Sequence, residues 1–176
     1  MSGKNSYDGS KISKKIELAE ARQKIASYCA YQERAHSEVE EKLYSYGLHR
    51  DEVEELLAWL ISENFVNEER FAITFAGGKF RVKRWGKLKI KMYLQQRKVS
   101  EYSINKALAA IDETTYTESV DYLIERATHN LKAKNIYEFR DKISRSVIAK
   151  GYEPELVWDR IKRLVKDNST HDETDY

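Results

Sequence analysis

A chain of 176 residues with 34% charged residues, seven glycines and one proline has the composition of long helices, and it lacks the turn residues of a β-sandwich or barrel. The net charge of +2 conceals a separation, because residues 17–78 hold 13 acidic and 6 basic residues whereas residues 79–100 hold 9 basic residues and no acidic one. One cysteine excludes an internal disulfide, and the four scattered histidines lack the spacing of metal ligands. We therefore expect an all-α protein of a reducing cytoplasm.

The first predicted helix covers residues 16–33 and follows a polar stretch, 1–15, that lacks the apolar core of a signal peptide. A second helix begins near Ser37–Glu40, which fits a capping box, and ends at Gly47. The third contains the longest uninterrupted apolar run, 56–61, which is far too short to span a bilayer. We expect residues 1–15 to be a disordered tail, and we expect no contact with a membrane.

Two further helices are predicted over residues 68–84 and 117–132, where Asn67 and the capping-box sequence Thr115–Glu118 supply start signals. Each is followed by two more helices that are joined at a tight turn. The chain ends in residues 167–176, which are polar, acidic and without periodicity. We expect this end to be a disordered acidic tail.

The helix pairs repeat along the chain. Six positions recur 51 residues later and again 53 residues after that: Leu43, Gly47, Leu48, Val53, Leu57, Leu60; Leu94, Lys98, Val99, Ile104, Leu108, Ile111; Val147, Gly151, Tyr152, Val157, Ile161, Leu164. Five of the six positions are large and apolar in every copy, and their spacing places them on one helical stripe. The sequence thus predicts three tandem, helix-turn-helix-like repeats of three helices each, at residues 16–66, 67–113 and 114–166.

One segment allows a different secondary structure. Lys87–Met92 alternates strictly between basic and apolar residues, which by itself indicates a half-buried strand. The repeat register instead predicts a helix in which Ile90 and Leu94 face the core. In that helix Leu88 and Met92 face away from the core, toward solvent or a partner, and the strand is the alternative.

With the repeat in place, residues 21–166 resemble the RecX family, the bacterial modulators of the RecA recombinase filament. Four segments carry the resemblance: Arg34–Leu43, Leu60–Ala72, Arg84–Gly86 followed by Ile90 and Leu94, and Gly151–Tyr152 followed by Val157 and Ile161. The second segment is similar to the family's most recognisable stretch, although Glu68 stands where aspartate is usual. Lys98 departs from the family's glycine, so the helix before it is expected to end without a left-handed residue.

The resemblance implies an elongated, curved array of helical repeats that lies in the groove of a RecA–DNA filament. It implies a regulator that inhibits or modulates the ATPase and strand-exchange activities of RecA, and so affects DNA repair, recombination and the SOS response. The expected partners are the RecA filament and single- and double-stranded DNA, bound without sequence preference in a bacterial cytoplasm. We expect a monomer when the protein is free, and no cofactor.

The segment best suited to bind an anionic polymer covers residues 79–98, and we name it the basic segment. Its nine cationic residues are Lys79, Arg81, Lys83, Arg84, Lys87, Lys89, Lys91, Arg97 and Lys98. Since no acid lies among them, their mutual repulsion favours a bound anion, either DNA phosphates or an acidic protein groove. The alternative interpretation is an ordinary solvated face. Phe80 and Trp85 interleave with the charges, and their helical spacing favours the core over stacking on bases.

A weaker basic patch is predicted in the third repeat, partly balanced by acids. Its members are Arg140, Lys142, Arg145, Lys150, Arg160, Lys162 and Arg163. Elsewhere in the chain, Arg34 and Arg70 each follow an acid and are interpreted as members of structural ion pairs.

No catalytic or metal-binding residue is predicted. Cys29 lies among apolar residues, which favours a buried small hydrophobe over a nucleophile, and the sequence has no phosphate-binding glycine loop or nucleotide fingerprint. Two other functions stay open. A helix-turn-helix transcription regulator would read duplex DNA, although no second helix of a pair carries a cluster of base-reading side chains. A purely protein-binding scaffold would bind nucleic acid only weakly and with little dependence on salt.

Overall fold

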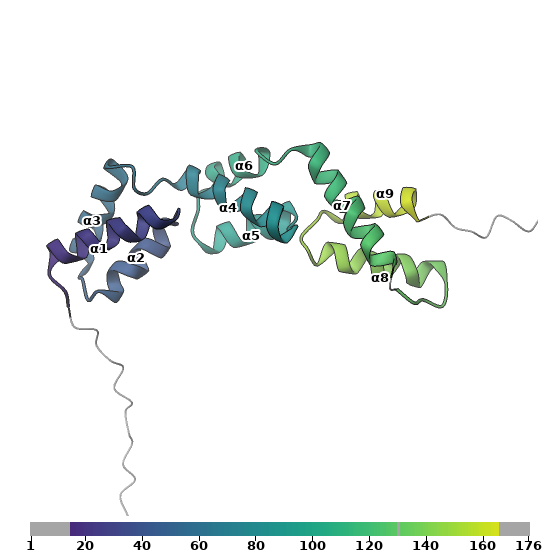
Figure 1. The fold of residues 1–176 in the computed structure, drawn as a ribbon, viewed down its shortest axis with the longest axis horizontal. Coiled ribbons are helices and arrows are strands. Elements are labelled where there is room, and N and C mark those ends of the chain that lie inside the picture. Colours follow the sequence, from purple (N-terminus) through teal and green to yellow (C-terminus); the bar gives the residue numbers. More distant parts are fainter. Residues whose placement is uncertain (1–14, 130, 166–176) are drawn as a thin grey trace, which may run out of the picture. The chain divides into compact units, whose positions relative to one another are not determined.

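The computed structural model describes residues 15–129 and 131–165, and Figure 1 shows their helices. These residues form nine α-helices and no strand, which confirms the all-α prediction. The alternating segment forms a helix, so the strand alternative is wrong. The two predicted tails, 1–15 and 167–176, lie outside the described residues except for Lys15.

The chain divides into two compact units, Met1–Phe71 and Ala72–Tyr176. Helix α4 (Glu68–Lys83) crosses the boundary between them. The helices follow the predicted order, so that α1–α3 form the first repeat, α4–α6 the second and α7–α9 the third. The limits drawn between the repeats at residues 66/67 and 113/114 stay a prediction.

The first repeat contains α1 (Leu18–Tyr31), α2 (His36–Ser45) and α3 (Arg50–Ser62), which pack pairwise around one core. Helical spacing places the buried residues on one face of each helix: Ala21, Ile25, Cys29, Val39, Leu43, Val53, Leu56 and Leu60. The prediction that Cys29 is a buried small hydrophobe is thereby confirmed.

The two start signals predicted in the first unit have different outcomes. Asn67 caps α4, because its side-chain oxygen accepts a hydrogen bond from the N–H of Arg70 at 2.9 Å. The capping box at Ser37 is wrong, since Ala35 occupies the cap position of α2. There Glu38 stabilises the helix start, because its carboxylate accepts the N–H of Ala35 at 3.2 Å.

The second unit contains α5 (Lys87–Gln96), α6 (Glu101–Ala109), α7 (Glu113–Thr128), α8 (Ile136–Ile148) and α9 (Pro154–Leu164). Helix α5 packs against α6, while α7, α8 and α9 pack against one another (Figure 1). Each helix contributes fully buried residues, among them Ile90 and Leu94 of α5, as the repeat register predicts.

Helix α7 begins and ends earlier than the predicted range of 117–132. Its cap is Asp112, whose carboxylate accepts hydrogen bonds from both the N–H and the hydroxyl of Thr115, each at 2.8 Å. These bonds hold the pKa of Asp112 below its usual value. A carboxylate at this end is also favoured by the helix dipole, so Asp112 takes the cap position that the sequence motif assigned to Thr115.

The turn inside each repeat ends its helix with a left-handed residue. Gly47 has φ +79° and Gly151 has φ +92°, as expected for glycine at this position. Lys98 adopts the same conformation with φ +58°, so the expectation of a helix end without a left-handed residue is wrong. A residue with a Cβ pays roughly 1 kcal/mol for this conformation, which the surrounding repeat imposes.

The last helix of the third repeat faces its core differently from α3 and α6. The buried positions are Val53, Leu56 and Leu60 in α3, and Ile104, Ala107 and Ile111 in α6 and just after it, but Val157, Ile161 and Val165 in α9 and just after it. Arg160 stands in α9 at the place of Leu56 and Ala107, and its guanidinium pairs with Asp121. Because a charged group is not buried in an apolar core, Val165 replaces Leu164, which was predicted as core and is 38% exposed.

The second and third repeats meet through their backbones. The N–H of Gly86 donates to the carbonyl of Lys150 at 2.9 Å, and the N–H of Leu88 donates to the carbonyl of Gly151 at 3.0 Å. A Cβ on Gly86 would lie 2.2 Å from the Gly151 oxygen, so only glycine permits this approach. Beside this joint, the Tyr116 hydroxyl accepts from the Lys87 N–H at 2.8 Å and donates to the Glu153 carboxylate at 2.7 Å.

Candidate nucleic-acid interface

The basic segment consists of the end of α4, the loop 84–86, α5 and the turn that follows it. Its apolar residues anchor it: Phe80 is buried, with its ring centroid 5.8 Å from that of Tyr116. The prediction that Phe80 belongs to the core is therefore confirmed, and this ring is not available to stack on a base. The cations around it have several different environments.

Two of the nine cations are neutralised by acids from outside the segment. The Lys87 ammonium lies 2.8 Å from the Glu113 carboxylate, and the Lys91 ammonium lies 2.6 Å from that of Glu101. The expectation of an uncompensated charge is therefore wrong at these two positions. Both acids lie beyond the acid-free stretch, so the local sequence could not reveal them.

Two other lysines are held by an aromatic ring. Lys79 and Lys89 place their ammonium groups 5.2 and 5.0 Å from the ring centroid of Trp85. The Trp85 ring is itself half-buried and packs against Tyr93 at a centroid distance of 4.7 Å. A cation–π contact orients an ammonium group without cancelling its charge, so both lysines stay able to bind an anion.

Arg84 lies between the second and third repeats. Its backbone is left-handed, with φ +50°, and its guanidinium lies 4.1 Å from the ring centroid of Tyr122. The same guanidinium reaches the Ser119 hydroxyl at 3.5 Å. These contacts fix the side chain against α7, and no carboxylate in the described part of the chain pairs with its charge.

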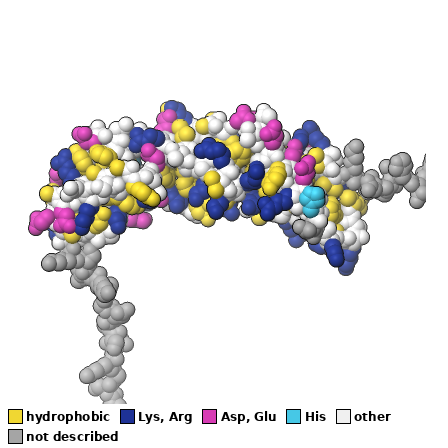
Figure 2. Space-filling model, in the orientation of Figure 1, with side chains coloured by type: hydrophobic (Ala, Val, Ile, Leu, Met, Phe, Trp, Pro, Cys, Tyr) yellow, Lys and Arg dark blue, Asp and Glu magenta, His cyan; other side chains and the backbone are white. Residues whose placement is uncertain are grey.

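The remaining cations differ in exposure. Arg81, Lys83 and Lys98 are exposed, and Arg97 donates to the Tyr93 carbonyl at 3.2 Å. Within the described residues, six cations have no ion pair with a carboxylate: Lys79, Arg81, Lys83, Arg84, Lys89 and Lys98. On the face drawn in Figure 2, Lys and Arg side chains are interspersed with hydrophobic ones. The structure thus reduces the candidate site from nine cations to these six. Lys87 and Lys91 are excluded because they are paired, and Arg97 is excluded because it bonds to a carbonyl.

The third-repeat patch is largely neutralised within its own repeat. Four of its seven cations pair with carboxylates: Lys142 with Glu138, Arg145 with Asp141, Arg160 with Asp121, and Arg163 with Asp159. Arg140 donates to the Val165 carbonyl at 2.7 Å. Lys150 and Lys162 are exposed. The expected secondary basic surface is therefore much weaker than its sequence density indicates.

The ion pairs predicted for Arg34 and Arg70 are half confirmed. Arg70 bonds to the Glu33 carboxylate at 2.6 Å, and its other nitrogens reach the Asn64 side chain at 2.9 Å and carbonyl at 3.0 Å. Arg34 instead places its guanidinium 4.0 Å from the ring centroid of Tyr28. Arg70 thus stabilises the start of α4.

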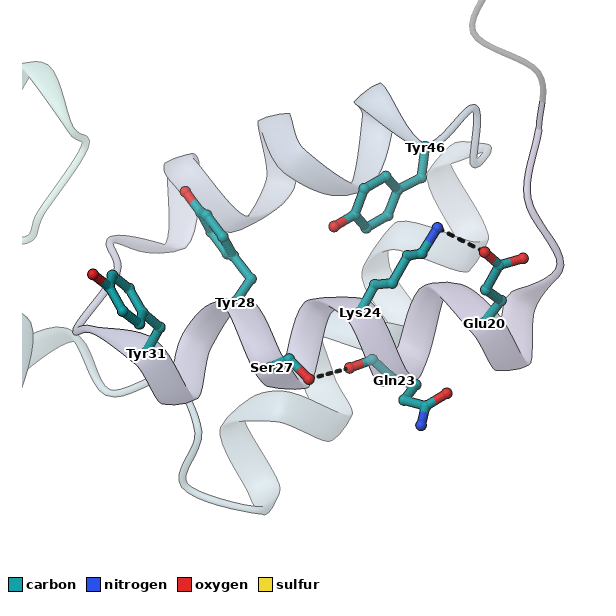
Figure 3. A pocket seen from close by; sticks show the side chains of 7 residues that line it. All are labelled: Glu20, Gln23, Lys24, Ser27, Tyr28, Tyr31 and Tyr46. Atoms are coloured by element: carbon teal, nitrogen blue, oxygen red, sulfur yellow. Dashed lines mark hydrogen bonds and ion pairs between the residues drawn. The ribbon is translucent and has the colours of Figure 1, made fainter.

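A hollow of about 690 Å³ on α1 was not foreseen from the sequence. Figure 3 shows Tyr28 and Tyr31 on α1 and Tyr46 beside Lys24, whose ammonium bonds to the Glu20 carboxylate at 2.6 Å. That bond raises the pKa of Lys24, and burial raises the pKa of Tyr46. The spacing of the two tyrosines on α1 was the feature of the sequence that could have indicated this hollow. The hollow is open to solvent and has no grouping of catalytic side chains.

The described residues offer no metal or reactive thiol site. No group of three or more His, Cys, Asp and Glu side chains that could hold a metal ion occurs among them. Burial raises the pKa of the Cys29 thiol to about 11, so the thiol stays protonated at neutral pH. In the same part of the chain, every helix is too short or too polar to cross a membrane.

Comparison with known proteins points to one family. Residues 67–108 match the family model described as "RecX, second three-helix domain". The chain is 25% identical over 155 residues to "Regulatory protein RecX" of Clostridioides difficile (strain 630), covering 88% of this chain and 71% of that protein. It is 23% identical over 141 residues to the protein of the same name from Bacillus cereus (strain B4264), covering 80% of this chain. The match spans about half of that relative, 52% of its length.

Solved structures show the same fold. A crystal structure of RecX from Lactobacillus salivarius superposes with a TM-score of 0.76 at 22% identity, covering 84% of this chain and 96% of that one. A crystal structure described as regulatory protein RecX gives a TM-score of 0.73 at 19% identity, covering 81% and 71% of the two chains. The family-model match, the sequence relatives and the shared helical-repeat fold together show that the chain is similar to RecX proteins in sequence and in fold.

Proposed function

We propose that this protein is a RecX-like regulator that binds the RecA–DNA filament and lowers the ATPase and strand-exchange activities of RecA, without catalysing a reaction itself. The observation that carries the proposal is the set of six cations that have no carboxylate partner among the described residues. All six lie within residues 67–108, the part of the chain that matches the RecX family model. The regulatory name of the sequence relatives supports a role in control rather than in chemistry.

Electrostatics supplies the affinity for DNA. If about five of the six cations meet phosphates, the logarithm of the binding constant falls with the logarithm of salt concentration at a slope of roughly −4 to −5. Lys79, Lys89 and Arg84 are already oriented by aromatic rings. Because less side-chain entropy is lost when such groups bind, they contribute more per contact than freely moving lysines. Contacts of this kind carry no sequence information, which suits a protein that acts along a filament.

The decisive experiment measures ATP hydrolysis by RecA on single-stranded DNA with this protein added at substoichiometric ratios. We expect the fractional inhibition of ATP hydrolysis to exceed the molar ratio of this protein to RecA, because a regulator bound to a filament affects the whole assembly. The length of the filaments, followed by electron microscopy, gives an independent readout. Unchanged hydrolysis together with unchanged filament length would contradict the proposal.

The helix-turn-helix alternative is tested by affinity for duplexes of different sequence. Helix α6, the second helix of the central pair, exposes Glu101 and Tyr102 in its first turn. An acid and a bulky ring at that position favour neither guanine nor adenine readout. We therefore expect equal affinity for unrelated duplexes of one length. A preference of 1000-fold or more for one sequence, on the order seen for specific DNA-binding proteins, would favour a transcription regulator instead.

A further inference from the structure

Helix α5 has apolar side chains on two opposite faces. Ile90 and Leu94 are fully buried, while Leu88 and Met92 are 48% and 45% exposed. Residues four apart are neighbours on a helix surface, so Leu88 and Met92 form one outward apolar pair. The alternation of the sequence is thus not a strand pattern, because it supplies one apolar pair to the core and a second one to the surface.

A lysine flanks the outward pair on each side. Lys91 precedes Met92, and Lys89 follows Leu88, while the helix Lys87–Gln96 contains no acidic residue. Lys91 is held by Glu101 and Lys89 by the ring of Trp85, so the stems of both side chains have fixed positions beside the pair. Lys89 lies in the first turn of α5, where the helix dipole makes a cation unfavourable.

A nucleic acid is a poor occupant for this face. Phosphates and sugars would leave Leu88 and Met92 largely hydrated, and these side chains have no π-face on which a base can stack. A protein groove would remove both from water, and recognition of a helix by a groove typically uses apolar anchors at positions i and i+4. Methionine is suited to such a role, because its flexible thioether adapts to an irregular surface. Lys89 keeps its positive charge beside the ring of Trp85, and an acidic rim of the groove complements that charge.

We infer that the outward face of α5 is a docking site for an apolar groove with an acidic rim on a protein, with Leu88 and Met92 as its anchors. The inference rests on the proposed function, in which the groove belongs to the protein component of the filament. The second repeat then has two different contact surfaces. Exposed cations such as Arg81 and Lys83 contact DNA, and the outward apolar pair of α5 contacts protein.

The test compares two ligands: a RecA filament assembled with a slowly hydrolysed ATP analogue on a labelled single-stranded oligonucleotide, and the same oligonucleotide alone. The variant Leu88→Ala with Met92→Ala should weaken filament binding by about 10- to 100-fold, the range of a lost pair of buried anchors. Its affinity for the free oligonucleotide should change by less than about twofold, since no charge is altered. Met92→Leu should retain most of the filament affinity, because it preserves the apolar volume.

A matched control removes two other exposed apolar side chains, through Ile61→Ala with Leu164→Ala, which are 45% and 38% exposed. Circular dichroism before and after heating checks that both double variants fold. If the wild-type protein does not bind the filament, the proposed function fails and the docking site fails with it. If the wild type binds and the α5 variant binds equally well, only the docking site is overturned. A parallel loss of affinity for the free oligonucleotide would also overturn it, because the face would then contact DNA.

Discussion

The second and third repeats have nearly the same supply of cations but use it differently. Six of the nine cations in the basic segment have no carboxylate partner among the described residues, whereas four of the seven in the third-repeat patch pair with a carboxylate. Three of those four have an acid four residues earlier on the same helix. The comparison teaches that the spacing of acids, rather than the density of bases, decides whether a basic stretch becomes a basic surface.

The largest expected effect comes from breaking the joint between these two repeats. Gly86→Ala would place a Cβ 2.2 Å from the Gly151 oxygen, so we expect the free energy of unfolding to fall by about 3 kcal/mol or more. Thermal or urea unfolding measures it. Gly78→Ala is the matched control, because a Cβ there meets nothing within 4 Å and should stabilise α4 by about 0.5–1 kcal/mol. Equal effects of the two variants would show that the joint does not hold.

The next effect tests the charge comparison itself. Arg81→Gln, Lys83→Gln and Lys98→Gln together should flatten the salt dependence of DNA binding by about 2 to 3 in slope and weaken binding about 10- to 100-fold. The control triple is Lys142→Gln, Arg145→Gln and Arg163→Gln, which removes the same charge from paired side chains. We expect it to change the slope by less than about one. Fluorescence anisotropy at several salt concentrations decides between them, and a stronger effect of the control would reverse the assignment.

A smaller effect appears at alkaline pH. Burial raises the pKa of Tyr116 above its usual value of 10.0, and it does the same for Tyr152. The folded protein therefore keeps protons that the unfolded chain releases above pH 10, so stability is full below that pH and falls as pH rises. Tyr116 should remove about 1.4 kcal/mol per pH unit as the pH rises above 10. Tyr116→Phe should lower the slope by that amount, whereas Tyr137→Phe, at a site 77% exposed, should leave it unchanged.

The smallest effect compares the turns of the two repeats. Lys98 adopts a left-handed backbone where the third repeat has Gly151. Lys98→Gly should stabilise the protein by up to about 1 kcal/mol and reduce the salt slope by about one. Lys98→Ala separates the two causes, because it removes the charge and keeps the strain. If Lys98→Gly is no more stable than Lys98→Ala, the left-handed backbone at this residue is not strained.

The sequence predicted the parts of the fold that depend on local periodicity. Buried residues such as Ile90, Leu94 and Tyr152 recur in register, and helical spacing alone identifies them. It failed where a distant partner decides the outcome. In α9, Arg160 pairs with Asp121 of another helix. Val165 is therefore buried in the core, whereas Leu164, the position predicted from the repeat, is exposed.

The sequence predicted which segment carries the candidate site, but it did not predict which cations of that segment pair with carboxylates. The six cations with no carboxylate partner in the part of the chain that the structure describes lie where the charge pattern placed them, because a run without acids can be read from the sequence alone. The acids that neutralise Lys87 and Lys91 lie 26 and 10 residues further along, and only the folded chain brings them close. The contacts of Trp85 with Lys79 and Lys89 depend on how α4 and α5 meet, which no spacing rule supplies.

The joint at Gly86 also provides a built-in reporter of motion. The amide protons of Gly86 and Leu88 are donated to carbonyls of the α8–α9 turn, so they exchange with solvent only when the second and third repeats part. Their exchange rates therefore measure the opening of this joint without any added label. A ligand that seats on both repeats at once would slow exchange at these two amides, and one that pulls the repeats apart would accelerate it.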